Sequence, residues 1–171
     1  MQILSTYRPC PWPWAGYAAC VWALLFAALS FYWAAGGRVG EGTIGAAVEG
    51  PALAREPWFV ALLWITAVLK LATAGLAFAL ARGPRWLPRY VLLFAGWGVA
   101  ALLSLYGLAN LVQHLLIATG VLAVPAGLGE AALPWHLLLW DPVWIVGGGL
   151  FTLASLGYSA SHTRTTWDPR R

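Results

Sequence analysis

Long apolar stretches separated by short polar segments make up most of this chain. One stretch, from Tyr90 to Gly129, contains no Asp, Glu, Lys or Arg. A helix of about 20 apolar residues crosses the ~30 Å hydrocarbon core of a bilayer, so such a stretch is long enough to span a membrane. The pattern predicts four membrane-spanning helices, at residues 14–35, 58–81, 90–119 and 142–161.

Glycine, proline and charged residues mark where these helices end. Gly36 and Gly37 end the first helix, and Pro57 is well placed at the start of the second. The apolar segment 134–140 is too short to cross a bilayer, so we expect an interfacial or re-entrant turn there. Asp141 is then expected to cap the N-terminus of the last helix.

Small residues recur on one face of two of the predicted helices, which allows membrane helices to pack closely. In the first helix this face consists of Ala15, Ala19, Ala23 and Ala27. In the last helix it consists of Gly148, Thr152, Ser155 and Ser159. The predicted fold is therefore all-α, an integral membrane four-helix bundle that forms a single domain over residues 1–171.

The composition excludes an ordinary soluble domain. Hydrophobic residues make up 61% of the chain and charged residues only 9%, whereas soluble domains carry about 25% charged residues. The 12 Trp residues are in keeping with this, since Trp is enriched at membrane interfaces. The net charge is +4, but the basic residues cluster at the ends of apolar stretches, so no nucleic-acid partner is expected.

The distribution of arginine predicts the side of the membrane on which each loop lies. The N-terminal lead, the 82–89 loop and the C-terminal tail contain Arg8, Arg82, Arg85, Arg89, Arg164, Arg170 and Arg171. The other two loops contain only Arg38 and Arg55. Because cytoplasmic loops carry the excess of Lys and Arg, both termini are expected in the cytoplasm of a multi-pass protein of the plasma (inner) membrane.

Neither the cysteines nor sequence motifs indicate a catalytic or metal centre. Cys10 precedes the first helix and Cys20 lies within it, a separation too large for a disulfide. There is no CxxC motif, so structural zinc and thiol redox chemistry are not expected. No GxSxG, HExxH or P-loop motif occurs either. The sequence therefore assigns no catalytic residue, metal or cofactor.

Lys70 is the most informative single residue, because it lies near the middle of the second predicted span. A lysine at the centre of a membrane helix costs roughly 2.5–3.5 kcal/mol on insertion scales. Its side chain is too short to reach either interface, so it should face the interior of the bundle. Its functional interpretation is a proton site, an anion site or a ligand contact. The alternative is a structural polar contact that fixes the register of the helices.

A polar stripe in the third span suggests where a ligand could bind. Tyr106, Asn110, Gln113 and His114 fall near one face of that helix. Together with Lys70, Asp141, Tyr32 and Trp33 they define a predicted outward-facing polar pocket. The alternative is that these groups hydrogen-bond between helices and serve only packing. His114 and His136 could also be proposed as haem ligands, but no recognisable pairing motif supports this.

Two stretches carry a resemblance to a known family. FYWAAGG closes the first span, at residues 31–37, and LLLWDPVWIVGGGLF opens the last, at 137–151. Together they resemble an uncharacterised, domain-of-unknown-function family of small four-helix actinobacterial membrane proteins. Many members of that family carry a His just before the Tyr–Trp pair, where this chain has Ser30 and Phe31. The resemblance implies a topology and no activity.

Three functions remain open from the sequence. The first is a non-enzymatic accessory subunit or a bundle that binds a small ligand or lipid in the polar pocket. The second is a small transporter or proton-conducting element that uses Lys70. The third is a membrane enzyme acting on a lipid or quinone, with His114 as its acid–base group. The expected partners are the lipid bilayer and either another membrane protein or further copies of the chain.

Overall fold

The computed structural model describes residues 11–84 and 86–161, and the regular structure within them is helical. The elements in chain order are α1 (Pro13–Ala34), the 3₁₀ turn η1 (Glu41–Thr43), α2 (Ala46–Leu53), α3 (Pro57–Arg82), α4 (Arg89–Ala118), α5 (Leu133–Trp135), the π-helical turn η2 (His136–Trp140) and α6 (Asp141–Ala160). Several residues named in the sequence analysis lie outside the described residues: Arg8, Cys10, Arg85, Arg164, Arg170 and Arg171.

Within the described residues, four helices are long and apolar enough to cross a membrane, as the sequence predicts. The first three of these are α1, α3 and α4. The fourth extends from Leu133 to Ala160 and so includes α5 and η2 as well as α6. Residues 134–140, expected to form an interfacial or re-entrant turn, are instead helical and continue directly into α6. The expected N-cap at Asp141 is therefore wrong, because the helix begins upstream of it.

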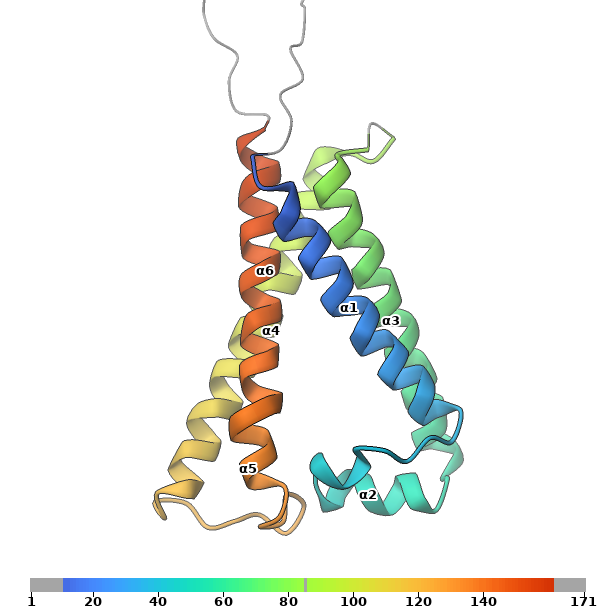
Figure 1. The fold of residues 1–171 in the computed structure, drawn as a ribbon, viewed down its shortest axis with the longest axis vertical. Coiled ribbons are helices and arrows are strands. Elements are labelled where there is room, and N and C mark those ends of the chain that lie inside the picture. Colours follow the sequence, from blue (N-terminus) through green and yellow to red (C-terminus); the bar gives the residue numbers. More distant parts are fainter. Residues whose placement is uncertain (1–10, 85, 162–171) are drawn as a thin grey trace, which may run out of the picture.

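The four long helices form two pairs that diverge (Figure 1). α1 packs mainly on α3, and α4 packs mainly on α6. The pairs approach one another where α3 ends and α4 begins, and they separate toward the opposite end, where α2 lies across the opening (Figure 1). The structure therefore has a close end and a wide end, and contacts between α1 and α6 join the two pairs.

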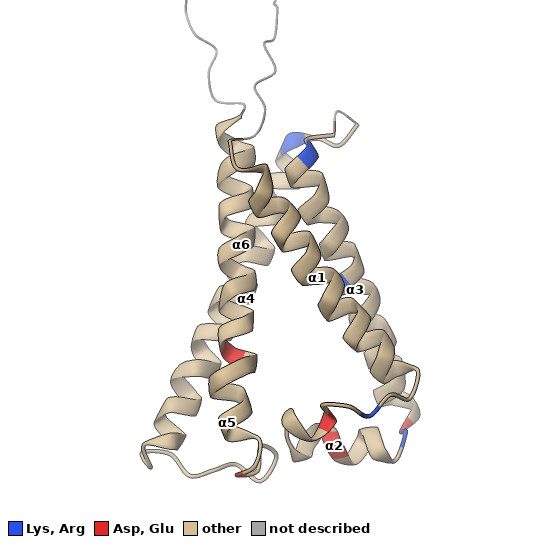
Figure 2. Ribbon diagram, viewed as in Figure 1, with Lys and Arg blue, Asp and Glu red and all other residues tan. Residues whose placement is uncertain are grey.

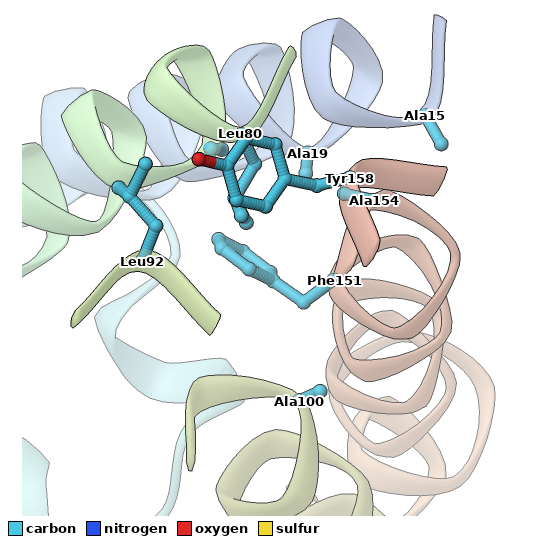
Figure 3. Packing of buried hydrophobic residues seen from close by; sticks show 9 residues of the cluster. Ala15, Ala19, Leu80, Leu92, Ala100, Phe151, Ala154 and Tyr158 are labelled. Atoms are coloured by element: carbon cyan, nitrogen blue, oxygen red, sulfur yellow. The ribbon is translucent and has the colours of Figure 1, made fainter. Parts of the chain in front are cut away.

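Small residues are found where the pairs approach closely. The predicted alanine face of α1 is confirmed, because Ala15, Ala19, Ala23 and Ala27 are all at most 2% exposed. Larger apolar side chains from the other helices complete the core at this end, among them Leu80 and Phe151 (Figure 3). This arrangement follows from geometry, since only small residues allow two helix backbones to come close.

Aromatic side chains fill the space toward the wide end. On α1, Trp22 stacks on Phe26, with ring centroids 4.7 Å apart. Trp144 of α6 packs against both rings, at 5.9 Å and 5.1 Å. Trp140 contacts Phe26 at 6.3 Å and Trp33 at 6.2 Å. Large rings thus keep α1 in contact with α6 as their backbones separate, which small residues could not do.

Glycines allow α4 and α6 to pack against each other. A Cβ atom on Gly148 of α6 would lie 2.8 Å from the backbone nitrogen of Ser104 in α4. A Cβ atom on Gly107 of α4 would lie 2.9 Å from the backbone nitrogen of Ile145 in α6. Both distances are shorter than real contacts of this kind, so a side chain at either position would push the helices apart.

Charged residues occur mainly at the two ends of the helices (Figure 2). Arg82 ends α3 and Arg89 begins α4, at the close end. Acidic residues are found near the wide end, in and around η1 and α2, and one lies on α6 (Figure 2). There Arg55 donates hydrogen bonds to the carbonyl groups of Trp33 and Ala34, at 3.4 Å and 3.1 Å. These carbonyls end α1, so the arginine side chain caps that helix.

Candidate functional site

A cavity of about 170 Å³ is lined by residues of both helix pairs. Its walls come from both pairs and from the segment after η1. The residues that line it are Phe26, Leu29, Trp33, Ile44, Lys70, Tyr106, His136, Trp140, Asp141 and Trp144. Most of these side chains are aromatic or aliphatic, and the lining also holds an ammonium group, an imidazole and a carboxylate, from Lys70, His136 and Asp141. An apolar cavity with a few polar groups is the usual form of a small-molecule site.

Lys70 provides the basic group on the α1–α3 side of the cavity. Its Nζ atom donates a hydrogen bond to Oγ of Ser30 in α1, at 2.6 Å. The same atom lies 5.6 Å from the centre of the Phe26 ring, within the range of a cation–π contact. The lysine therefore faces the interior of the bundle, and one hydrogen bond leaves part of its ammonium group available to a ligand.

The α4–α6 side of the cavity holds a buried acid–base pair. Nδ1 of His114 lies 2.6 Å from Oδ2 of Asp141. His114 is 5% exposed and Asp141 only 1% exposed. Because a carboxylate oxygen accepts, Nδ1 of His114 carries the hydrogen in this bond. A buried charge needs such a partner, since leaving it alone in an apolar interior would be very costly.

His136 approaches the same carboxylate from the preceding turn of the helix. Its Nε2 atom lies 2.8 Å from the carbonyl oxygen of Ile44, which can only accept, so Nε2 carries a hydrogen. Its Nδ1 atom lies 3.7 Å from Oδ1 of Asp141. The rings of His114 and His136 are 4.6 Å apart between their centres. Two imidazoles and one carboxylate thus converge on a small volume.

The π-helical turn η2 explains how His136 and Asp141 come together. In an α-helix, residues five apart point to nearly opposite faces, because each residue turns the chain by about 100°. The backbone N–H of Asp141 instead bonds the carbonyl of His136 in a π-type turn, which stacks the two residues. Pro142 is a physical cause of this π-type turn. In a regular α-helix its ring would clash with the carbonyl group of the residue four positions earlier, and proline has no backbone N–H to donate.

A family model described as "Protein of unknown function (DUF3995)" matches residues 23–151. The chain belongs to this family. The expected membership of a family of unknown function is thereby confirmed. No curated protein and no solved structure matches the chain. Every residue that lines the cavity of this DUF3995 protein lies within the matched segment.

The DUF3995 chain brings some of the residues of the predicted polar pocket together. Lys70, Asp141, Tyr106 and Trp33 line the cavity. His114 lies behind Asp141, to which it is hydrogen-bonded. Lys70 and Asp141 thus border one cavity although they come from different helix pairs, and the described hydrogen bond of Lys70 goes to Ser30.

The remaining residues of the predicted pocket do not line this cavity. Asn110 donates to the carbonyl of Tyr106, one turn earlier in its own helix, at 2.8 Å. Gln113 is exposed on the surface of α4. The hydroxyl group of Tyr32 accepts a hydrogen bond from the backbone N–H of Val39, in the loop after α1. Within the DUF3995 fold these groups satisfy local hydrogen bonds or face the surroundings.

Several cavity residues of the DUF3995 chain were not identified from its sequence. Trp140 packs on Phe26 and Trp33 and donates to Oγ1 of Thr43 at 3.2 Å, contacts between distant segments that periodicity does not reveal. For His136, the sequence offers only the alternative of a haem ligand. The only sequence signal for its role is Pro142, which follows Asp141 and favours a distorted turn before it.

Proposed function

We propose that this protein is a non-enzymatic, multi-pass membrane protein that binds a small, ring-sized ligand between its two helix pairs. The observation that carries the proposal is the cavity, with Lys70 on one wall and Asp141 on the other. Its volume, about 170 Å³, is close to that of an engineered protein cavity of ~150 Å³ that binds benzene. The ligand is therefore a small molecule or the head group of a lipid-soluble compound.

The lining of the cavity defines the chemistry of this ligand. Phe26, Trp33, Trp140 and Trp144 favour a planar, apolar ring, which can stack on their faces. The ammonium group of Lys70 favours a carbonyl oxygen or an anionic group at one end of that ring. A quinone head group and an aromatic carboxylate both have this combination. The proposed ligand class is a planar ring that carries at least one hydrogen-bond acceptor.

The proposed setting is the plasma (inner) membrane, with both termini in the cytoplasm. Support comes from four apolar helices of sufficient length and from the excess of arginine in the 82–89 loop and the terminal segments. In this orientation the wide end and the cavity lie in the outer half of the membrane. The many exposed apolar side chains of α3 and α4 then contact lipid, another membrane protein or a second copy of the chain.

The test is to identify what the protein carries and whether Lys70 holds it. Native mass spectrometry of protein released from mild detergent should reveal an added mass of a small organic molecule. A water-soluble naphthoquinone should also quench the tryptophan fluorescence of the purified protein in a saturable way, because three Trp side chains line the cavity. A protein that shows neither an organic adduct nor saturable quenching would contradict the proposed function.

Two variants make the test specific to the cavity. Lys70→Met should weaken naphthoquinone binding at least tenfold, because it removes the charged donor and retains an apolar stem. Thr66→Ala is the matched control. Thr66 lies on the same helix as Lys70, and its hydroxyl group donates to the backbone carbonyl of Leu63 within that helix. Equal loss of binding in both variants would indicate a general effect on α3.

The buried His114–Asp141 pair favours a second candidate, a membrane enzyme that acts on a lipid or quinone. A histidine held by a carboxylate next to an open cavity is an arrangement suited to proton transfer. His114 does not line the cavity, so the proton would reach a substrate through Asp141. This candidate predicts that His114→Gln keeps naphthoquinone binding but abolishes any conversion of the bound compound.

A further inference from the structure

Three side chains beside the cavity offer a set of donors that differs from the rest of its lining. His114 of α4, His136 of η2 and Asp141 of α6 each offer one atom suited to bind a metal, and these atoms lie within 4.8 Å of one another. Imidazole nitrogen and carboxylate oxygen are the donors that zinc and non-haem iron take in proteins. His136 and Asp141 are five residues apart in one continuous helix, and the packing of α6 on α4 adds His114.

The position of His136 gives the strongest geometric argument. Its Nε2–H bonds the carbonyl oxygen of Ile44, so a neutral His136 directs the lone pair of Nδ1 away from that bond. This Nδ1 atom lies 3.7 Å from Oδ1 of Asp141, which is too long for a hydrogen bond. When His136 is neutral, both atoms are electron-pair donors, and both attract a cation placed between them. The site therefore has the polarity of a cation site.

The distance between these two atoms fits a transition metal. With bonds of about 2.1 Å to each atom, a separation of 3.7 Å corresponds to a ligand–metal–ligand angle of roughly 125°. This angle is wider than the ideal tetrahedral angle and is compatible with a distorted four-coordinate site. The hydrogen bond from His136 to Ile44 is also the outer contact that metal-binding histidines usually make, and it fixes the orientation of the ring.

His114 is the third ligand, and its Nδ1 atom must lose its proton to bind the metal. Its Nδ1–H now bonds Oδ2 of Asp141 at 2.6 Å. Two ligands of one tetrahedral ion lie roughly 3.3 Å apart, so binding through Nδ1 requires a small rotation of the imidazole and loss of that proton. Loss of ligand protons on metal binding is general for histidine sites. Metal binding would thus displace the proton that His114 and Asp141 share.

The cavity supplies the remaining coordination position. His136 and Asp141 both line it, so an ion held between them is accessible from its interior. Three protein ligands with one open position are typical of metal sites that bind a small molecule or activate water. The two histidine rings, 4.6 Å apart between centres, leave no room for a porphyrin between them. A single ion fits this arrangement and a bis-histidine haem does not.

We propose that His114, His136 and Asp141 bind one divalent first-row transition metal ion, of the zinc or ferrous iron type, with an open position toward the cavity. This differs from the expectation from sequence, in which no metal was assigned. The proposal does not rest on the proposed ligand-binding function, because the three side chains form the site with or without an organic ligand. Lys70 belongs to the opposite wall and is not a metal ligand.

The experiment is a metal titration of the intact protein in detergent. The protein is purified without a polyhistidine tag and treated with a chelator. Zn²⁺ uptake is measured by mass spectrometry of the element, and Co²⁺ binding by its visible absorption. We expect one ion per chain, competition between Co²⁺ and Zn²⁺, and an intense Co²⁺ spectrum typical of four-coordinate geometry. A folded wild-type protein that takes up neither ion saturably would overturn the proposal.

Variants distinguish this site from adventitious binding. His136→Ala should weaken Co²⁺ binding at least tenfold, and His114→Ala and Asp141→Asn should do the same. Glu130→Gln and Lys70→Met are the controls and should bind Co²⁺ as the wild type does. Unchanged affinity in His136→Ala would overturn the proposal. His136 is part-buried and not in the tight pair, so this variant also addresses the site if Asp141→Asn fails to fold.

The same variants separate failure of the metal site from failure of the proposed function. If only the ligand-binding function is wrong, Co²⁺ binds but naphthoquinone does not quench tryptophan fluorescence. If only the metal site is wrong, naphthoquinone binds to a protein that takes up no Co²⁺. Lys70→Met should affect quenching alone, and His136→Ala should affect Co²⁺ affinity.

Discussion

The imidazole of His114 and the carboxylate of Asp141 form a 2.6 Å contact in which both residues are almost completely removed from the surface. One residue lies on α4 and the other at the start of α6, so the contact joins the two helices of one pair. An ion pair in such surroundings is expensive to form, because both groups lose their hydration. Removing either side chain would therefore leave the other buried without this partner.

This dependence predicts strong coupling between the two residues. Asp141→Leu alone should destabilise the protein by about 3–5 kcal/mol, because it leaves a buried polar partner behind. The double variant His114→Leu/Asp141→Leu should be clearly more stable than the sum of the single effects predicts. Unfolding of the detergent-solubilised protein, followed by circular dichroism, measures all three variants. Additive effects would show that the two side chains are not an energetic pair.

The close packing of α4 and α6 predicts opposite effects for two neighbouring glycines. Gly148→Ala should lower stability by about 1–3 kcal/mol, because its Cβ would lie 2.8 Å from the backbone nitrogen of Ser104. Gly149→Ala should raise stability slightly, by about 0.5–1 kcal/mol, since a Cβ there meets no atom within 4 Å. Thermal unfolding of both variants tests this. Equal effects would argue against the described α4–α6 contact.

The hydrogen bonds that cap α1 predict that Arg55, but not Arg38, contributes to stability. Arg55→Ala removes the hydrogen bonds to the carbonyls of Trp33 and Ala34, and should cost about 1 kcal/mol. Arg38→Ala changes the charge of the same loop by the same amount and serves as the control. Because Trp33 lines the cavity, Arg55→Ala should also weaken naphthoquinone binding. A similar loss in Arg38→Ala would point to loop charge as the cause.

The proposed orientation predicts which loops a reagent can reach from outside. In a protein whose native Cys10 and Cys20 are replaced by Ser, Val39→Cys and Trp86→Cys each introduce one exposed thiol, since these positions are 76% and 80% exposed. A membrane-impermeant maleimide should label Val39→Cys in intact cells. It should label Trp86→Cys only after lysis. The reverse pattern would place both termini outside the cytoplasm.

The sequence was a good guide to features that depend on local periodicity. The four long helices and the buried alanine face of α1 follow from hydrophobicity and from spacing in steps of four. The interior position of Lys70 follows from the length of its side chain and its distance from both ends of the helix. These features need no knowledge of how the helices pack.

Features that depend on the path of the fourth long helix could not be predicted. His136 and Asp141 are five residues apart, a spacing that an α-helix places on different faces. Only the π-helical turn η2 brings them together. The pairing of Asp141 with His114 depends in addition on how α6 packs against α4. Periodicity within one helix contains no information about either relationship.

The divergence of the two helix pairs has a mechanical consequence. Lys70 belongs to one pair and Asp141 to the other, and the pairs approach closely at one end only. A tilt of one pair relative to the other, about the end where they touch, would therefore move the residues of the cavity walls more than those at the close end. Bilayer thickness acts on the tilt of membrane helices. In a bilayer, the width of the cavity should therefore change with bilayer thickness.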